Sequence, residues 1–278
     1  MSDRLKVLPQ YLMPKGALTR LAGRYASASL GGMTTSTIRR FVARYGVNMD
    51  EAAEPDIRAY KTFNEFFTRA LKPGARPLAQ APLICPVDGA ISQVGRIQGD
   101  QVYQAKGQAF STTALVGGDA ALAARFQDGL FANLYLSPKD YHRIHMPAAG
   151  RLVRMVHVPG ELFSVNPTTA RGVPGLFARN ERVVCVFDNE QLGRWVLVLV
   201  GATIVGSMAT VWHGVIQRSG PVRAWDYQDR DIRLAQGDEM GRFLLGSTVV
   251  MLFEPSALQF NPAWQPGGGV RMGELMAS

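Results

Sequence analysis

Cysteine and histidine are scarce in this sequence, which has two cysteines and four histidines in 278 residues. Cys85 and Cys185 are isolated, and their spacing suits neither a disulfide framework nor a zinc site. A secretory signal is also missing, because no continuous apolar core with a small-residue cleavage site stands near the N-terminus. We therefore expect buried, unreactive thiols in a protein that faces the cytosol.

Long apolar runs are nearly absent as well. Residues 195–212 form an uncharged run that approaches the length needed to span a bilayer. Valine, isoleucine and threonine are frequent in it, and Gly201 and Gly206 stand where a strand would bend. This composition predicts one or two buried strands in place of a transmembrane helix, so any association with a membrane would be peripheral.

Acidic residues are missing from almost the whole N-terminal region. Before Asp50 the only acid is Asp3, and eight cations minus this one acid give +7 of the formal net charge of +8. The rest of the chain is nearly neutral, so we expect an anionic partner to meet the N-terminal region. The eight cations are Arg4, Lys6, Lys15, Arg20, Arg24, Arg39, Arg40 and Arg44.

Apolar residues alternate with these cations at roughly helical spacing, although Pro9, Pro14 and Gly16 interrupt any single helix. The pattern predicts short interfacial helices that lie on an anionic membrane. The alternative is helices that pack on the core and expose a solvated basic face. Nucleic acid is a poor candidate, because no zinc module, helix-turn-helix signature or aromatic RNA-binding motif accompanies the charge. The apolar residues are Leu8, Leu12, Leu18, Leu21, Ala22 and Tyr25.

The remaining chain has mainly the pattern of β-strands. Short alternating apolar runs occupy residues 90–97, 151–158, 182–187 and 248–253, bounded by Gly, Pro, Asn and Asp. They predict an α+β fold that is mainly β, with an antiparallel sandwich or barrel-like domain over residues 63–278 and N-terminal membrane-associating helices within residues 1–62. Residues 55–71 and 120–127 have a helical pattern, and residues 265–274 are expected to form a loose tail.

The tripeptide Gly246-Ser247-Thr248 allows a reaction of the chain with itself. The hydroxyl of Ser247 can attack the carbonyl of Gly246, since glycine permits the strained backbone that this requires. The peptide becomes an ester, and β-elimination followed by hydrolysis would leave an N-terminal pyruvoyl group in place of Ser247. Such a tripeptide is common in turns, so the hypothesis depends on partner residues.

Two upstream segments supply partners. Asp88 lies at a turn next to Gly89, and His142, His145 and Asp140 are concentrated between two prolines. A metal site is a weak alternative, because the two histidines lack the glutamate of a zinc-binding helix motif. A general-base role fits better: Asp88 would orient an imidazole that takes the proton of Ser247, in a Ser-His-Asp arrangement.

These residues belong to longer segments that closely resemble the phosphatidylserine decarboxylase proenzymes, over nearly the whole chain. The resemblance implies that Asp88, His145 and Ser247 form the self-cleavage triad, and that His142 takes part in decarboxylation. The segments are residues 63–78 (FNEFFTRALKPGARPL), 86–89 (PVDG), 135–147 (YLSPKDYHRIHMP), 159–167 (PGELFSVNP), 180–182 (NER) and 245–248 (LGST).

The same resemblance implies a reaction and its products. Cleavage between Gly246 and Ser247 would give a large β chain, residues 1–246, and a small α chain, residues 247–278, which together form a heterodimer. The pyruvoyl group, a covalent cofactor that needs no metal, would form a Schiff base with phosphatidylserine and accept electrons as carbon dioxide leaves. His142 is the candidate proton donor, and phosphatidylethanolamine is the product. The enzyme would lie peripherally on the cytoplasmic side of the cell membrane, with further dimerisation left open.

Two other interpretations use the same residues. A serine hydrolase with Asp88, His145 and Ser247 would remain uncut and react with fluorophosphonates, although the Gly-x-Ser-x-Gly elbow is absent. A non-enzymatic membrane-binding β module would bind lipid whether or not Ser247 is replaced.

Overall fold

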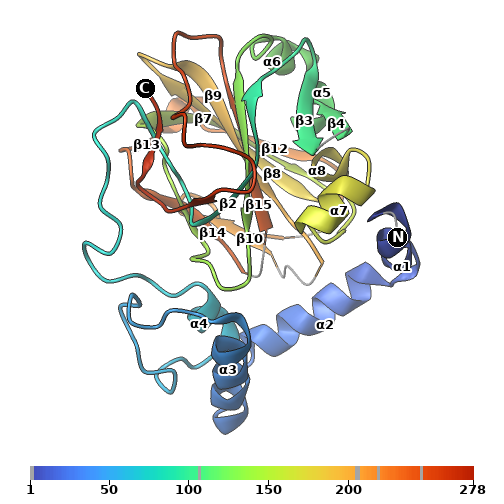
Figure 1. Ribbon diagram of the computed structural model, residues 1–278, viewed down its shortest axis with the longest axis vertical. Coiled ribbons are helices and arrows are strands. Elements are labelled where there is room, and N and C mark those ends of the chain that lie inside the picture. The colour runs from blue at the N-terminus through green and yellow to red at the C-terminus, as the bar shows by residue number, and fades with distance from the viewer. Residues whose placement is uncertain (1–2, 106–107, 204–206, 218–219, 245–246) are drawn as a thin grey trace.

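The computed structural model describes residues 3–105, 108–203, 207–217, 220–244 and 247–278. Helices are concentrated near the N-terminus and on one side of the sheets (Figure 1). They are α1 (Asp3–Leu12), α2 (Lys15–Ser27), α3 (Gly32–Tyr45), α4 (Phe63–Phe67), α5 (Thr112–Leu115), α6 (Ala120–Ala124), α7 (Pro167–Gly172), α8 (Leu176–Arg179) and the 3₁₀ turn η1 (Gln228–Arg230).

Antiparallel strands make up most of the regular structure. They are β1 (Leu83–Ile84), β2 (Gly89–Arg96), β3 (Gln101–Ala105), β4 (Gln108–Ser111), β5 (Leu130–Leu136), β6 (Arg143–His145), β7 (Gly150–Val158), β8 (Arg182–Asn189), β9 (Gly193–Val200), β10 (Met208–Thr210), β11 (Gly214–Ile216), β12 (Arg223–Asp226), β13 (Arg233–Leu234), β14 (Glu239–Phe243), β15 (Ser247–Phe253), β16 (Gly269–Val270) and β17 (Leu275–Ala277).

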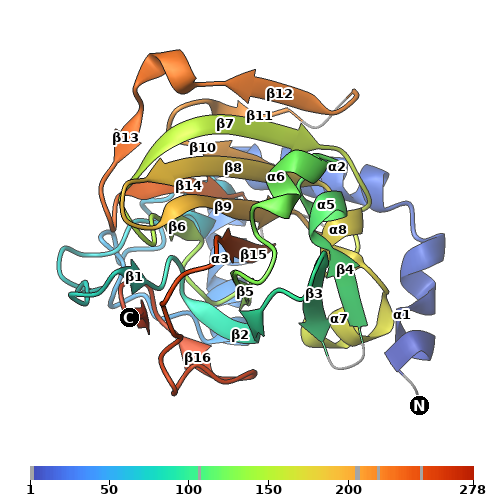
Figure 2. The same cartoon turned by 90° about the horizontal axis from the view of Figure 1, so that it is seen from above.

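A nine-stranded sheet forms the centre of the molecule (Figure 2). Its order is β12-β7-β8-β9-β15-β5-β2-β16, with β13 also paired to β7. A four-stranded sheet, β11-β10-β14-β6, contributes Ile144, Met208 and Phe243 to the same buried cluster as Val249 and Met251 of the large sheet. The mainly β, antiparallel fold predicted from the sequence is therefore confirmed, and within the described residues the sheets do not close into a barrel.

Alternation of side chains along β15 divides the core in two. Val249 and Met251 face the cluster shared with the small sheet, whereas Val250 and Leu252 face a second cluster that includes residues of α5 to α8. Successive residues of a strand point to opposite faces, so a strand buried on both faces is apolar at nearly every position. This accounts for the continuous apolar sequence of β15 and β9.

The predicted strands are present with small shifts at their ends. β2, β7, β8 and β15 cover the four alternating runs, and α6 forms the first part of the helix predicted at residues 120–127, ending at Ala124. The uncharged run at residues 195–212 contains most of β9 and all of β10, as predicted, although its Gly206 lies outside the described residues. Across the described part of the chain, no helix is long and apolar enough to cross a membrane.

The helix predicted at residues 55–71 is wrong over most of its length, because the only helix there is α4. Thr62 starts α4: its hydroxyl accepts a hydrogen bond from the Glu65 N–H at 3.1 Å, and the Glu65 carboxylate accepts one from the Thr62 N–H. This reciprocal capping box marks a helix start. Before it, Asp56 accepts the N–H of Arg58, which holds a turn.

The loose tail predicted at residues 265–274 is also wrong. β16 pairs with β2, β17 pairs with β1, and the N–H of Met272 donates to Asp88 Oδ1 at 2.9 Å. Val270, Met272 and Met276 are buried against the main core. These apolar residues follow the three glycines at 267–269. The glycine-rich composition of the segment obscured its apolar pattern.

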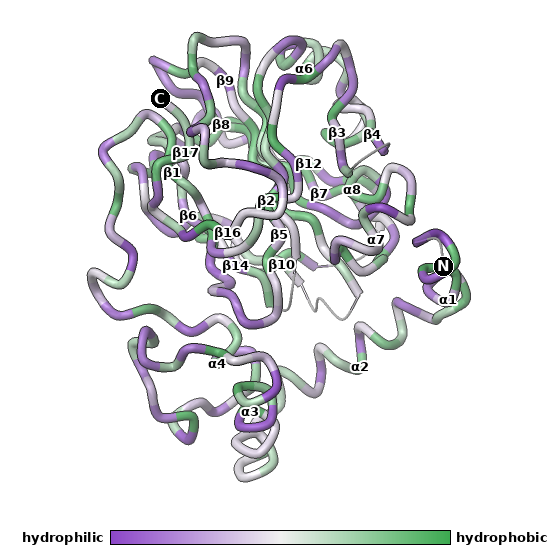
Figure 3. Tube along the Cα trace, in the orientation of Figure 1, coloured by the Kyte–Doolittle hydropathy of each residue, from purple (hydrophilic) through white to green (hydrophobic). Residues whose placement is uncertain are grey.

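The N-terminal helices pack only partly on the sheets (Figure 1). Of the three predicted interruptions, Pro14 lies between α1 and α2 as expected, whereas Pro9 lies inside α1 and Gly16 inside α2. Val7 is buried against Gly172 of α7, whereas Leu12 is 89% exposed. Figure 3 shows apolar and polar residues interleaved along α1 and α2.

A first prediction concerns the close approach of β2 to β5. A Cβ on Gly89 would clash with the carbonyl oxygen of Tyr135, which is backbone and cannot move away alone. We expect Gly89→Ala to lose about 1–3 kcal/mol of stability or more, measured as a lower midpoint of thermal unfolding. Gly95→Ala on the same strand is the control, because its Cβ would be 3.4 Å from the Phe131 ring edge. Equal midpoints for the two variants would contradict this account of the strand contact.

Candidate active site

Three strand ends meet at one edge of the large sheet. β5 lies between β2 and β15, with Ser247 opposite Leu136 and Ala90 opposite Tyr135. Gly89 lies beside Leu136 on the other side, since a Cβ built on Gly89 would be 3.5 Å from the Leu136 Cα. Neighbouring strands are about 4.8 Å apart, so the backbones at Gly89 and Ser247 are separated by about 10 Å.

The loop that follows β5 brings both histidines to this edge. It is shaped by Asp140, whose Oδ2 accepts the N–H of Ser137 at 2.6 Å. Burial raises the pKa of the Asp140 carboxyl. The loop then enters β6, where the His145 N–H donates to the Pro86 carbonyl at 2.9 Å, two residues before Asp88.

His142 is fully buried and stacks on α4. Its ring centroid is 4.0 Å from that of Phe67, and its Nδ1 donates to the Asp140 carbonyl at 2.8 Å. Burial lowers the pKa of His142 to about 3, so the ring is neutral at physiological pH. With the proton on Nδ1, Nε2 carries a lone pair, and it has no hydrogen-bond partner in the part of the chain the structure describes.

His145 is held through both ring nitrogens. Nδ1 lies 2.7 Å from the Gly237 carbonyl, which can only accept, so the proton is on Nδ1. Nε2 therefore accepts from the Tyr141 hydroxyl, 3.1 Å away. Burial lowers the pKa of His145, which leaves a neutral imidazole with Nε2 as its basic atom.

Asp88 is bound by an arginine and not by a histidine. Arg76 Nε and Nη2 donate to its carboxylate at 2.9 and 2.5 Å, and the same guanidinium donates to Glu51 at 2.7 Å. With the Met272 N–H also on Oδ1, the carboxylate oxygens are well occupied. The two acids raise the pKa of Arg76 above its already high value, so its charge is permanent.

Ser247 is 1% exposed, and its Oγ has no hydrogen-bond partner among the described residues. A buried hydroxyl without a partner is unusual in a folded protein. Gly246, the other side of the predicted cleavage site, lies outside the described residues. The structure thus brings Asp88, His142, His145 and Ser247 to one edge of the sheet, and it forms no hydrogen bond within this group.

Sequence reasoning missed the residues that hold this group in place. Arg76 and Phe67 lie within the quoted segment 63–78, and Tyr141 lies within segment 135–147. Each was visible as part of a motif, but no spacing rule connects Arg76 with Asp88 or Tyr141 with His145. The remaining sequence expectation, buried cysteines, is confirmed, and burial raises the pKa of both thiols.

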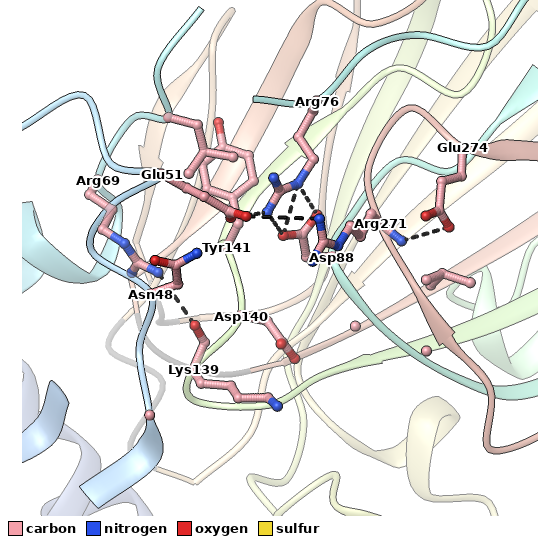
Figure 4. Close-up of a pocket in the computed structure, with 15 residues that line it drawn as sticks. Asn48, Glu51, Arg69, Arg76, Asp88, Lys139, Asp140, Tyr141, Arg271 and Glu274 are labelled. Atoms are coloured by element: carbon pink, nitrogen blue, oxygen red, sulfur yellow. Dashed lines mark hydrogen bonds and ion pairs between the residues drawn. The ribbon is translucent and has the colours of Figure 1, made fainter. Parts of the chain in front are cut away.

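A cavity of about 350 Å³ opens beside Asp88 (Figure 4). Its wall combines the β2 and β5 ends, the C-terminal segment around β16, and the turn after α3. The charged and amide side chains that line it are Asn48, Glu51, Arg69, Arg76, Asp88, Lys139, Asp140, Arg271 and Glu274. The described residues contain no group of three or more His, Cys, Asp or Glu side chains able to hold a metal ion.

Comparisons with known proteins give one consistent result. A family model described as phosphatidylserine decarboxylase matches residues 63–278, and a second, described as PSD, matches residues 5–46. A phosphatidylserine decarboxylase proenzyme of Variovorax paradoxus (strain S110) is 71% identical over 280 residues, covering 100% of this chain and 99% of the relative. The proenzyme of Acidovorax ebreus (strain TPSY) is 70% identical over 279 residues, covering 100% and 98%.

A second prediction follows from the buried His142. Its folded pKa, about 3, is below the 6.5 of a free imidazole, so the unfolded chain binds the proton more readily. The resulting stability is present above about pH 6.5 and is lost as the pH falls from there toward 3, at up to about 1.4 kcal/mol per pH unit. We expect the unfolding midpoint of His142→Gln to fall less steeply than that of the unaltered protein between pH 7 and pH 5. Slopes unaffected by His142→Gln would contradict a buried neutral ring.

Proposed function

Because this chain belongs to the phosphatidylserine decarboxylase family, we propose that cleavage between Gly246 and Ser247 prepares it for its reaction. That reaction is the decarboxylation of phosphatidylserine to phosphatidylethanolamine and carbon dioxide, in phospholipid biosynthesis. The observation that carries the proposal is the similarity over the full chain, joined to a buried Ser247 whose hydroxyl is unpartnered among the described residues.

The first step of the proposed maturation is proton removal from Ser247. His145 Nε2 is the base, and its contact with the Gly237 carbonyl keeps the lone pair on that atom. Tyr141 occupies Nε2 in the structure, so its hydroxyl must give way to Ser247. Asp88 supports the imidazolium that forms through its negative charge, which favours the protonated ring; both ring nitrogens are already engaged, by the Gly237 carbonyl and by Ser247.

The bonds then change within the chain itself. Ser247 Oγ attacks the carbonyl carbon of Gly246, and the peptide nitrogen leaves as the amine of Ser247. Loss of the Ser247 α-proton breaks its Cβ–O bond and releases the carboxylate of residue 246. Hydrolysis of the dehydroalanine releases ammonia and leaves the pyruvoyl group at the start of β15. Among the described residues, no hydrogen bond competes for the Ser247 hydroxyl, which leaves its oxygen available for the attack.

The pyruvoyl group supplies a carbonyl that can take up the substrate amine and accept electron density as carbon dioxide leaves. Residues of the chain must also accept and donate the protons of the reaction. The ammonium of phosphatidylserine has to lose one before its nitrogen can react, and His142 Nε2 is a neutral acceptor with a free lone pair. We assign His142 to accept this proton and return it to the substrate α-carbon.

The two chains produced by cleavage stay together through the large sheet. The small chain has 32 residues, since 278 − 246 = 32, which is too few to fold alone. β15 is paired with β5 on one side and β9 on the other, and β16 and β17 pair with β2 and β1. The mature unit is therefore proposed as a heterodimer of residues 1–246 and 247–278.

Residues 1–62 are proposed as a membrane-associating region and residues 63–278 as the catalytic domain. The strongest support is the exposure of large apolar side chains on α1 and α2 among an excess of cations, a combination that suits an anionic lipid surface. Association would be peripheral, on the cytoplasmic face. The exposed apolar side chains of α1, α2 and the turn between them are Leu5, Leu8, Tyr11, Leu12, Met13, Leu18, Leu21 and Tyr25.

A third prediction tests the covalent event. The denatured mature protein should contain two chains that separate at Gly246, with the smaller one lighter than the serine-initiated residues 247–278 by the mass of one ammonia, because a pyruvoyl group stands in place of Ser247. Ser247→Ala should remain a single inactive chain. Ser256→Ala is the matched control, because its hydroxyl also has no hydrogen-bond partner among the described residues and lies in the same C-terminal piece.

In the same experiment, replacement of His142 tests maturation and turnover separately. We expect His142→Gln to be cleaved normally, while kcat falls about 100- to 10,000-fold. An uncut but active chain would refute self-cleavage, and normal turnover by His142→Gln would remove that residue from the reaction.

A fourth prediction concerns the membrane. Replacing Leu12 and Leu21, which are 89% and 68% exposed, by serine should weaken binding to anionic vesicles by at least about tenfold, because each buried leucine contributes about 1.5–3 kcal/mol. Turnover of a soluble short-chain phosphatidylserine should not change. Val222→Ser is the control, since this residue is also exposed but lies in the β-rich domain. Vesicle sedimentation measures the binding, and equal binding by the two variants would contradict the proposal.

A further inference from the structure

The side chains that line the cavity beside Asp88 have no net formal charge, but their charges are not all paired. Four cations and four carboxyl groups line it. Arg76 holds Asp88 and Glu51, Asp140 accepts the Ser137 N–H, and Glu274 accepts the Arg271 N–H at 3.0 Å. Arg271 is 3.8 Å from Glu51. The two cations left over are Arg69 and Lys139 (Figure 4).

Arg69 is a buried charge without a counter-ion. It is 5% exposed, its Nη2 donates only to the Lys139 carbonyl at 3.3 Å, and its guanidinium lies 5.4 Å from the centre of the Phe66 ring. Its Nε has no hydrogen-bond partner, and no carboxylate pairs with it within the residues that the structure describes. Burial lowers the pKa of this guanidinium. A buried cation is costly unless an anion compensates it.

Lys139 brings a second cation to the rim of the same cavity. Its side chain is exposed, and it makes no ion pair with any described residue. Its backbone carbonyl is the group that binds Arg69, so Arg69 is held beside the residue that carries the second cation. A buried guanidinium and an exposed ammonium at the entrance together suit a small anion.

We propose that Arg69 and Lys139 bind the phosphodiester of the lipid headgroup. The proposal rests on the proposed function, and it adds which residues recognise the substrate. Arg69 Nε and its neighbouring Nη donate to the non-bridging oxygens, and Lys139 closes the entrance.

The reach of the headgroup limits where in the cavity the phosphodiester can bind. Four bonds separate the amine nitrogen of a serine headgroup from its phosphorus, about 5 Å when extended. The cavity wall includes Gly89, whose backbone is about 10 Å from Ser247 across two strand spacings. The reach of about 5 Å is shorter than this separation, so the phosphodiester has to bind on the side of the cavity nearest Tyr141, whose hydroxyl contacts His145 Nε2.

The substrate carboxylate is a poorer partner for Arg69 than the phosphodiester. A carboxylate loses its charge as carbon dioxide forms, so a cation bound to it would stabilise the starting state more than the transition state. The charge of the phosphodiester does not change during the reaction. Its binding energy therefore contributes equally in both states and serves to position the substrate.

The test compares two soluble substrates on cleaved enzyme. One is short-chain phosphatidylserine below its micellar concentration, and the other is the O-hexyl ether of serine, which has the same amine and carboxylate but no phosphate. We expect Arg69→Gln to lower kcat/KM for the first about 10- to 100-fold, mainly through KM, and to leave that for the second unchanged. Arg69→Lys should recover part of the loss, and Lys61→Gln, an exposed cation outside the cavity, should have no effect.

The outcomes distinguish this inference from the proposed function. An unaltered enzyme that does not decarboxylate phosphatidylserine refutes the proposed function. If it does, equal losses of kcat/KM on both substrates in Arg69→Gln would assign Arg69 to the carboxylate and overturn the inference. Unchanged kinetics in this variant would overturn it too. Should Arg69→Gln fail to mature, Lys139→Gln carries the test, because its exposed side chain can be replaced without disturbing the core. Lys139→Gln should lower kcat/KM a few-fold for the phosphodiester substrate alone. If this loss is absent, the inference is overturned.

Discussion

The hydrogen-bonded ladder of β5, β15 and β9 is the constraint on which the rest of the structure depends. β15 is paired from Thr248 to Phe253 on both sides, so its first residue is fixed in register opposite Leu136. That register buries Ser247 and places it beside the loop that carries both histidines. It also explains how a chain can be cut at this point and remain folded, because Thr248 to Phe253 stay paired with β5 and β9 after the bond to residue 246 is lost.

The same ladder places the acid and the base near each other without joining them. Asp88 is bound by Arg76 and the Met272 N–H, while His145 is bound by Tyr141 and the Gly237 carbonyl. Each group is satisfied before any reaction, so the proposed self-cleavage has to break existing hydrogen bonds and form new ones. Arg76 compensates the charge of the buried Asp88, which a neutral imidazole alone would not do.

Sequence patterns predicted the parts of the structure that repeat over many residues. The alternation at residues 90–97 and 182–187 extends over enough positions to identify β2 and β8, whereas β16 and β17 have two and three residues and show no period. The motif segments identified Asp88, His142, His145 and Ser247 as candidates. They did not reveal that Arg76 holds Asp88 or that Phe67 covers His142, because these contacts join separate segments and depend on how the sheets and α4 pack.

The electrostatics of the site connect substrate binding to proton transfer. Burial is the main reason that the pKa of His142 is low, and the nearby charge of Arg69 lowers it further. An anion bound to Arg69 offsets that second contribution, because the guanidinium and the anion together present little net charge to the imidazole. The basicity of His142 therefore increases when the phosphodiester is in place, which is the state in which its Nε2 has to accept a proton. A buried arginine left without a carboxylate thus has a physical use: its charge is compensated by the substrate, and the compensation adjusts the neighbouring base.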